Sequence, residues 1–507
     1  MIPVARKRVA SSTSIPAPVG GLNARDSIAN MPPTDAVSMD NWFPNTSYVS
    51  VRNGSKTWAT GLPSYVESLC AYNGSTGSKL FACSGGGIYD VTAGGAVGAP
   101  VVTGNTSNRF QHTNMGNAAG QWLIMANGAD PVRNFDGTTW TASAITGVSP
   151  SLLNTPLAYK NRLFFIENNS FRFWYLPLLA VQGAATSFDL SSLFKLGGYL
   201  QSIFDWTIDN ATGIQSYFVA VSSQGEIVTY QGNDPSTVGS WAIAGHFRIG
   251  RPIGKKSFCK IGSDIALICA DGLYPISKAL LTDRSQRQDA LSDKIVNLVT
   301  NDVSNYANNF GWQAILYPIG NKVIINVPQV ENKVSYQYVM NSITGAWCRF
   351  TGWNASCWEL LNDNIYYGTQ GKVVRADYGT SDDSASITAD CQQAFSYFGD
   401  AGSNKRFTMA RPILQSNGQI TPTLIINTNF ETGAPLSLLS FSVTTFSPWN
   451  VSPWNTSPWS QGNQTRSDWQ SVAAIGFSGA AHVGLSVKGA YANWQSTDIL
   501  YESGGVL

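Results

Sequence analysis

The chain is poor in charged residues. Only 12% of its 507 residues are Asp, Glu, Lys or Arg, about half the share that is usual in globular proteins. The 32 basic and 31 acidic residues nearly cancel, which leaves a formal net charge of +1. This balance argues against a protein that binds nucleic acid through its overall charge. Gly, Ser, Thr and Asn dominate the polar positions, as expected for a subunit locked into an assembly or for a β-rich protein with polar loops.

Histidine is scarce, and the motifs of catalysis are missing. The three histidines, His112, His246 and His482, lie far apart, and none has metal-ligand spacing such as H-x-x-x-H. No G-x-S-x-G elbow occurs, although the members of a Ser-His-Asp triad need not be adjacent in sequence. We therefore expect no enzymatic activity, no cofactor and no metal.

C-x-x-C motifs and apolar runs long enough to span a membrane are also absent. The number of cysteines is odd and no C-x-x-C pair exists, so we expect buried, reduced thiols after synthesis in a cytosol. The basic N-terminus, MIPVARKRVASSTS, lacks the apolar stretch of a secretory signal, and no apolar run is long enough to span a bilayer. The seven cysteines are Cys70, Cys83, Cys259, Cys269, Cys348, Cys357 and Cys391.

What the chain does contain is a recurring strand–turn–strand pattern. Lys79 to Val91, KLFACSGGGIYDV, reads as an apolar strand, a glycine turn and a second strand. Similar segments return at roughly 40 to 55 residues, a period typical of propeller blades. The sequence predicts an all-β protein with a β-propeller of about six to seven blades and inserted loops; ordinary hairpins in a stacked sandwich are the alternative. The repeated segments are 121–135, 161–175, 216–231, 264–276, 321–339 and 364–376.

Composition divides the chain into three parts. Residues 1–20 form a Pro- and Ser-rich, flexible N-terminal arm, residues 21–390 the propeller, and residues 391–507 a smaller C-terminal β-sandwich or barrel-like domain. Within the propeller, apolar residues spaced between Leu291 and Tyr306 predict a short amphipathic helix.

The arm carries a cluster of positive charge. Arg6, Lys7 and Arg8 follow one another near its start. Such arms are usually disordered until they dock. We interpret this one either as a docking arm that ties the subunit to a neighbour or as a solvated tail.

A second basic cluster lies near the middle of the chain. It resembles a phosphate loop only superficially, because Gly250 and Gly254 enclose three residues where a P-loop needs four. Two interpretations remain: a loop that faces DNA or an acidic partner, and a solvated propeller turn. The candidate partner-facing residues are Arg248, Arg251, Lys255 and Lys256, with Lys260 nearby.

Near the C-terminus a Ser-Pro-Trp motif repeats three times over residues 447–459. Proline excludes helix and central strand, so this segment is expected to be an extended loop. Trp449, Trp454 and Trp459 recur at regular spacing and bring a large apolar area, as interface anchors do. We interpret them as an intersubunit or interdomain clamp.

Several irregular stretches resemble one protein family. The beginning reads GGLN at residues 20–23, MPPTDA at 31–36, DNWFP at 40–44 and VRNG at 51–54; Gly250 to Lys278 and the closing strands from Trp494 to Gly505 add to the likeness. Together they resemble the tail nozzle proteins of short-tailed, podovirus-like bacteriophages. These are also called tail hub or packaged-DNA stabilisation proteins, and the likeness extends over nearly the whole chain.

The resemblance implies a structural virion protein of a head–tail connector. Such subunits join, usually as a hexamer, below the portal–adaptor ring. They form the channel for DNA ejection, close it against a needle or plug, and help to carry tailspikes or fibres. Double-stranded DNA would pass without sequence-specific contacts, past channel loops that we expect to be polar or acidic, because each basic contact would hold the DNA back. The protein would be made in the host cytoplasm and reside in the virion.

Two other classes of function remain open. One is a receptor- or carbohydrate-binding tail protein, although the chain lacks the solenoid repeat of elongated spikes. The other is a propeller glycosidase. That reading requires Asp, Glu and Arg clustered at the inner strand starts of several blades, where the sequence suggests Lys, Gln, Asn and Ser.

Overall fold

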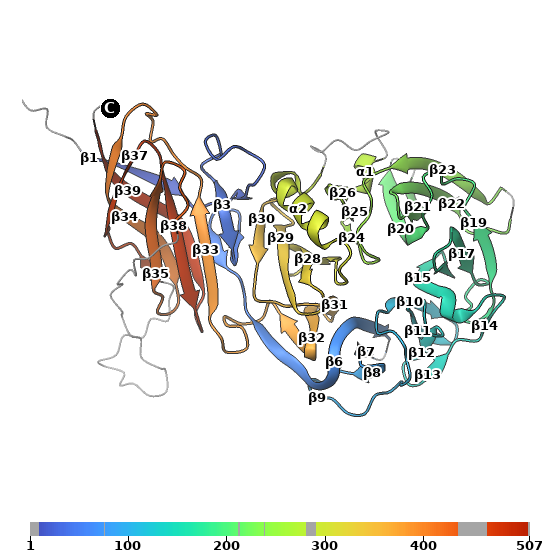
Figure 1. Cartoon of the computed structure of the whole chain (residues 1–507). Helices are drawn as coiled ribbons and strands as arrows, with labels where there is room; N and C mark the ends of the chain where they lie inside the picture. Colours follow the sequence, from blue (N-terminus) through green and yellow to red (C-terminus); the bar gives the residue numbers. More distant parts are fainter. Residues whose placement is uncertain are drawn as a thin grey trace, which may run out of the picture. The chain divides into compact units, whose positions relative to one another are not determined.

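The chain folds into two compact units made almost entirely of strands (Figure 1). The computed structural model describes residues 10–75, 77–210, 213–237, 239–279, 290–433 and 464–504. The larger unit, called the propeller, comprises Thr57–Tyr338 and Gly352–Ala376. The second, here called the terminal unit, comprises Met1–Lys56, Val339–Thr351 and Asp377–Leu507.

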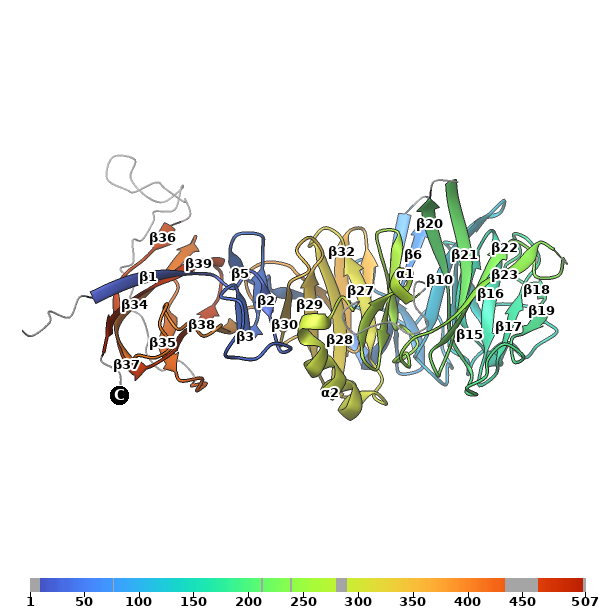
Figure 2. The ribbon, with the colours of Figure 1, turned by 90° about the horizontal axis from the view of Figure 1, so that it is seen from above.

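The sheets of the propeller follow one another along the chain. The first two sheets of four strands are β10 (Gln111–Asn117), β11 (Gly120–Ala126), β12 (Arg133–Phe135) and β13 (Trp140–Ala142), then β15 (Leu153–Tyr159), β16 (Arg162–Glu167), β17 (Arg172–Tyr175) and β19 (Thr186–Asp189). The third is β20 (Leu200–Asn210), β21 (Gly213–Ser222), β22 (Glu226–Gly232) and β23 (Trp241–Arg248). A three-stranded sheet follows, with β24 (Phe258–Ile261), β25 (Asp264–Cys269) and β26 (Gly272–Pro275). Figure 2 shows the strands of successive sheets running between the two flat faces of this unit.

One sheet joins the beginning of the propeller to its end. Its strand order is β31 (Cys357–Leu361), β32 (Asn364–Ala376), β6 (Ser55–Gly74), β7 (Gly77–Ser84) and β8 (Gly87–Asp90), with β9 (Gly95–Ala96) on β6. The 20-residue strand β6 therefore lies between late and early strands of the chain. This closes the ring of sheets, while each blade keeps its own inner and outer edge strands.

The blade arrangement agrees with the predicted β-propeller. Five sheets of three or more strands lie in this unit, and β27 (Gln313–Tyr317), β28 (Lys322–Val330) and β29 (Val334–Asn341) form a further set (Figure 1). The arrangement is that of a five-bladed β-propeller, so the predicted count of six to seven blades is wrong. Smaller elements are the parallel pair β14 (Ile145–Thr146) and β18 (Gly183–Ala184), and the 3₁₀ turn η1 (Pro150–Leu152).

Aromatic residues fill the space between neighbouring sheets. Phe164 and Phe173 from one sheet pack against Phe218 and Tyr230 of the next, and all four are at most 3% exposed. The Phe164 and Phe218 ring centroids lie 5.0 Å apart. The apolar strands that the sequence repeats are thus the faces of adjacent blades, which need large side chains on both sides.

Most of the predicted hairpins are confirmed. The glycine turn after β7 leads directly into β8, with Gly85 and Gly86 at φ +56° and +81°, a region that favours glycine. The hairpin expected at residues 364–376 is wrong, because this segment is the single strand β32. Gly371 has φ +67° but lies inside that strand, so a glycine that signals a turn marks an irregularity instead.

Besides η1, the described residues of the propeller contain the short helical segments α1 (Ile276–Ala279), η3 (Asp293–Ile295) and α2 (Val296–Tyr306). The last two confirm the predicted amphipathic helix. Val299 and Val303 of α2 are buried, and Asp302 accepts a 2.6 Å hydrogen bond from the Tyr338 hydroxyl. Within the described ranges, no helix has both the length and the apolar character needed to cross a membrane.

The terminal unit contains two sheets built from both ends of the chain. One has the order β36 (Gln464–Arg466), β34 (Lys405–Ser416), β39 (Ala492–Ser503), β5 (Val49–Val51) and β4 (Trp42–Pro44), with β37 (Gln470–Gly476) on β34. The other contains β30 (Trp347–Phe350), β3 (Asp35–Asp40), β33 (Ile387–Gln393), β38 (Gly479–Val487) and β35 (Pro422–Thr428), with β2 (Gly21–Leu22) beside β3. The sheets contact each other through β35 and β37, as in a sandwich.

Two boundaries predicted from the sequence differ from this division. Residues 21–56, expected in the propeller, belong to the terminal unit, because β3 and β5 pair with β33 and β39 near the other end of the chain. The arm at residues 1–20 is not wholly flexible: β1 (Ala10–Pro16) pairs along its length with β39, from Ala10 opposite Glu502 to Pro16 opposite Ser496. Composition at Pro- and Ser-rich termini does not reveal a partner strand almost 500 residues away.

Candidate functional site

Two neighbouring cavities lie where the first strands of the propeller sheets converge. Their volumes are about 330 and 360 Å³. The second cavity receives residues from β10, β15, β20, β24, β27 and β31, each the first strand of its sheet or set. Propellers commonly hold ligands at this central position, and cavities of this size suit small molecules. Both cavities are lined by Gln111, Lys255, Lys256 and Gln313.

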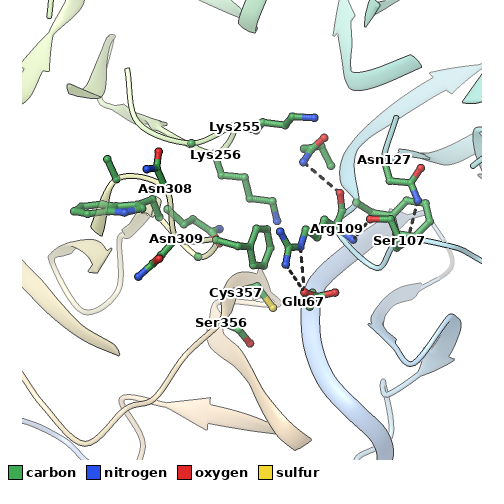
Figure 3. Close-up of a pocket in the computed structure, with 18 residues that line it drawn as sticks. Glu67, Ser107, Arg109, Asn127, Lys255, Lys256, Asn308, Asn309, Ser356 and Cys357 are labelled. Atoms are coloured by element: carbon green, nitrogen blue, oxygen red, sulfur yellow. Dashed lines mark hydrogen bonds and ion pairs between the residues drawn. The ribbon is translucent and has the colours of Figure 1, made fainter. Parts of the chain in front are cut away.

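The lysines come from the loop between β23 and β24. Gly254, at φ +71°, precedes them and lines the first cavity. Figure 3 shows Lys255 and Lys256 entering this cavity from one loop, while Arg109 and Glu67 come from a separate part of the chain. Among the described residues, neither ammonium group has a hydrogen bond or a carboxylate within 4.0 Å. Burial lowers the pKa of Lys255 from its usual value, because removal from water disfavours the charged form.

Arg109, by contrast, is fully engaged. Its guanidinium contacts Glu67 at 3.0 Å and also pairs with Glu331. The same group lies over the Phe310 ring, 4.2 Å from the centroid. Two carboxylates and one aromatic face hold this cation in place, so it serves to fix the cavity wall.

Glu359 of β31 lines the second cavity. Its side chain is only 16% exposed, and burial raises its pKa to about 7, against the opposing effects of Lys256 and the Leu360 amide. His112 of β10 lies beside it, with 3.7 Å between Nε2 and the Glu359 Oε2 atom. A carboxyl group with this pKa exchanges its proton near neutral pH.

The two glutamines of the cavities differ in how fully they are bonded. Gln313 is fixed by two hydrogen bonds to the Trp358 backbone, at 2.8 and 3.0 Å. Gln111 has only a 3.4 Å contact from Nε2 to the Arg109 carbonyl, and its buried Oε1 lacks a partner among the described residues. Gln111 therefore has unused hydrogen-bonding capacity at the cavity wall.

The structure separates the four basic residues predicted to face a partner. Lys255 and Lys256 line the cavities, whereas Arg248 and Arg251 are exposed. Nearby Lys260 is exposed as well and forms a 2.7 Å ion pair with Asp205. The predicted arm residues Arg6, Lys7 and Arg8 and the predicted clamp residues Trp449, Trp454 and Trp459 lie outside the described residues.

Sequence reasoning missed the charged groups that meet the lysines. Glu67 of β6 meets Arg109, which precedes β10, and Arg109 also meets Glu331, which follows β28; His112 of β10 lies beside Glu359 of β31. The sequence indicated no cluster of Asp, Glu and Arg at the inner strand starts; in the structure Arg109 and Glu331 meet Glu67 from connections rather than from strand starts. No local signal marks these residues, because Glu67 and Glu331 are 264 positions apart, His112 and Glu359 are 247 apart, and each group meets only after ring closure. No cluster of three metal-ligating side chains occurs in the part of the chain that the structure describes.

Comparisons with known proteins give fold-level likeness alone. No protein-family model matches the chain, and no curated protein matches it. Among solved structures, the chain is similar to BBS1N in its complex with ARL6DN, at 8% identity and a TM-score of 0.39 over 64% of this chain and 96% of that one. It is similar to the extracellular domain of BT4673 from B. thetaiotaomicron, at 12% identity and a TM-score of 0.41, over 70% of this chain and 43% of that one. It is also similar to YCF48 from Cyanidioschyzon merolae, at 11% identity and a TM-score of 0.35, over 63% of this chain and 98% of that one. Likeness at this level assigns no function, and the β-propeller class rests on the strand order of the chain itself.

Proposed function

We propose that this chain is a structural virion protein that forms the ring-shaped tail nozzle of a short-tailed bacteriophage. Several copies would assemble below the portal–adaptor ring around the channel for DNA exit, and would retain the packaged DNA until ejection. The proposal starts from the family resemblance in the sequence.

One observation carries this proposal furthest: the terminal stretches that bear the resemblance fold together. Val49 and Ser50 pair with Trp494 and Asn493 of β39. Trp42 and Trp494 are both fully buried, and their rings lie 5.8 Å apart. The terminal stretches of the resemblance therefore form one coherent structural unit, which supports a common fold more strongly than isolated motifs do.

A buried ion pair strengthens the same unit. Arg52, from the VRNG stretch, is 1% exposed at its side chain and holds Asp382 with contacts of 2.6 and 3.0 Å. Its Nε donates to Asn41 Oδ1 at 2.8 Å. Residues of the resembling stretches thus have specific packing roles.

The rest of the chain suits a subunit of a rigid ring. A propeller in which early and late strands of the chain share one sheet is a closed, stiff ring. Low charge limits the desolvation cost of large subunit contacts. Large apolar side chains also remain exposed in the terminal unit, among them Ile343 at 67% and Ile475 at 65%, as expected for a surface that meets a partner.

Electron microscopy of the purified full chain tests the proposal. Class averages with six-fold symmetry and a central hole of about 20 Å or more, wide enough for duplex DNA, would support the nozzle. Three-fold, elongated particles would indicate a receptor-binding spike instead. Single particles that stay single after addition of the portal–adaptor complex would overturn the proposal.

A second assay addresses the remaining alternative, a carbohydrate-binding or glycosidic propeller. Glycoside hydrolysis by a chain that forms no rings would favour it. A variant in which Trp449, Trp454 and Trp459 are replaced by serine separates assembly from folding: we expect lost rings with an unchanged melting temperature if these residues form the subunit clamp.

A further inference from the structure

In the part of the chain that the structure describes, the two cavity lysines form no direct ion pair, although Glu359 of the second cavity interacts electrostatically with Lys256. Lys255 and Lys256 are half-buried, and among the described residues neither has a carboxylate within 4.0 Å. The nearby carboxylates of Glu67 and Glu331 pair with Arg109 and not with the lysines. An anion that entered the cavity would offset the desolvation of two ammonium groups.

Hydrogen-bond acceptors lie beside these cations. Gln111 lines both cavities, and its Oε1 is unpartnered among the described residues. A rotation of its terminal amide group would turn either the oxygen or the nitrogen toward a ligand. Glu359 contributes carboxyl oxygens to the second cavity. Cations beside acceptors match a ligand that carries both a carboxylate and hydroxyl groups.

Part of the remaining wall of the second cavity is apolar. Leu157, Ile203 and Phe258 line it together with the polar groups. A cavity with one apolar wall and a few convergent polar groups binds compact ligands that have a C–H face. Its volume of about 360 Å³ restricts the ligand to the size of one or two sugar rings.

We propose that this cavity binds a sugar acid, either free or as the terminal unit of an acidic glycan. The carboxylate would lie between Lys255 and Lys256, hydroxyl groups would bond to Gln111 and Glu359, and the C–H face would pack on Phe258. The site is independent of ring assembly, because all of these residues belong to the propeller of one chain.

Calorimetry on the full chain tests the site with defined probes. We expect D-glucuronate or a glucuronate-ended trisaccharide to bind. Tighter binding of D-glucuronate would indicate a free sugar acid as the ligand, and tighter binding of the trisaccharide would indicate the end of an acidic glycan. Neutral glucose lacks the carboxylate, and acetate and phosphate lack the hydroxyl pattern, so each should bind at least about tenfold more weakly, equivalent to 1.4 kcal/mol. Absence of binding by both glucuronate probes, or equal binding by glucose, acetate or phosphate, would overturn the proposal.

Matched lysine variants assign the binding to the cavity. Lys255→Met and Lys256→Met should each weaken glucuronate binding at least about tenfold. Lys260→Met removes the same charge from an exposed position four to five residues away and should leave binding unchanged. An equal loss in all three variants would show that general positive charge, rather than the cavity, attracts the ligand.

A chemical footprint on the unmodified chain does not depend on variant folding. Glucuronate should slow the acetylation of Lys255 and Lys256 relative to Lys260, as followed by peptide mass spectrometry. Equal rates with and without glucuronate would place the ligand elsewhere and overturn the proposal.

Discussion

Glu359→Gln should make the protein more stable at alkaline pH. Glutamine keeps the size of the side chain but does not ionise. In the folded chain the pKa of Glu359 is raised from 4.5 to about 7 by burial, with Lys256 acting in the opposite direction. His112 at 3.7 Å, Lys255 and the Cys357 thiol also face this region. Because the folded state holds the proton more tightly than the unfolded chain, the ionised group destabilises the fold as pH rises.

The size of the effect follows from the two pKa values. Above pH 7 the wild-type chain loses about 3 kcal/mol of unfolding free energy relative to its protonated form, since each pKa unit corresponds to about 1.4 kcal/mol. Well below pH 4.5 the loss disappears. We therefore expect Glu359→Gln to exceed wild type by about 1 kcal/mol at pH 5 and about 3 kcal/mol at pH 8.

Urea unfolding followed by tryptophan fluorescence at pH 5, 6, 7 and 8 measures this difference. Glu431→Gln, at an exposed carboxylate of the terminal unit, is the matched control and should give no such rise between pH 5 and 8. A difference between Glu359→Gln and wild type that stays constant over this range would refute the reasoning. A variant that is less stable than wild type at pH 8 would refute it as well, because it would mean that the ionised carboxylate stabilises the cavity.

Three further predictions address packing. Arg52→Met should lower the unfolding free energy by about 3–5 kcal/mol in urea titrations, because it leaves Asp382 without its buried partner; the same change at Arg25, exposed beside Asp26, should alter it by less than about 0.5 kcal/mol. Gly225→Ala should lower the melting temperature more than Gly262→Ala: both glycines have positive φ, but only at Gly225 would a Cβ meet a carbonyl oxygen at 2.4 Å. All seven cysteines are buried, so Ellman's reagent should label none in the native protein and seven in urea.

Each of these comparisons has an outcome that contradicts the structure. Equal losses for the variants at Arg52 and Arg25 would mean that the buried pair is not formed. Equal melting temperatures for the two alanine variants would place Gly225 in open space. Rapid labelling of native thiols would show that the apolar strands carrying them are accessible.

The repeated strands could be predicted from the sequence because they depend on interactions between residues close together in the chain. Apolar runs bounded by glycine predict paired strands wherever the turn residues adopt left-handed conformations, as Gly85 and Gly86 do. The same rule failed at Gly371, where long β32 pairs on both sides and the neighbours override the local preference. The short helix from Val296 to Tyr306 was readable from its 3.6-residue periodicity.

Domain boundaries and the cavity depended on contacts that no local pattern encodes. Residues 21–56 look continuous with the strands that follow, yet they pair with β33 and β39 at the other end of the chain. The basic loop was visible in the sequence, but its division into cavity lysines and exposed arginines was not. That division depends on the turn at Gly254, which places Lys255 and Lys256 at the cavities.

The sequence by itself determined the strand-rich architecture, the propeller repeat and the low charge of the surface, since composition and alternation of residues act over a few positions. Only the tertiary structure decided which charges meet. Glu67, Arg109 and Glu331 form one cluster, and Glu359 faces His112, because ring closure brings the first strands of successive sheets to a common centre. The pKa of Glu359 and, among the described residues, the absence of a direct ion pair at Lys255 follow from burial at that centre, a property of the assembled sheets and not of any short segment.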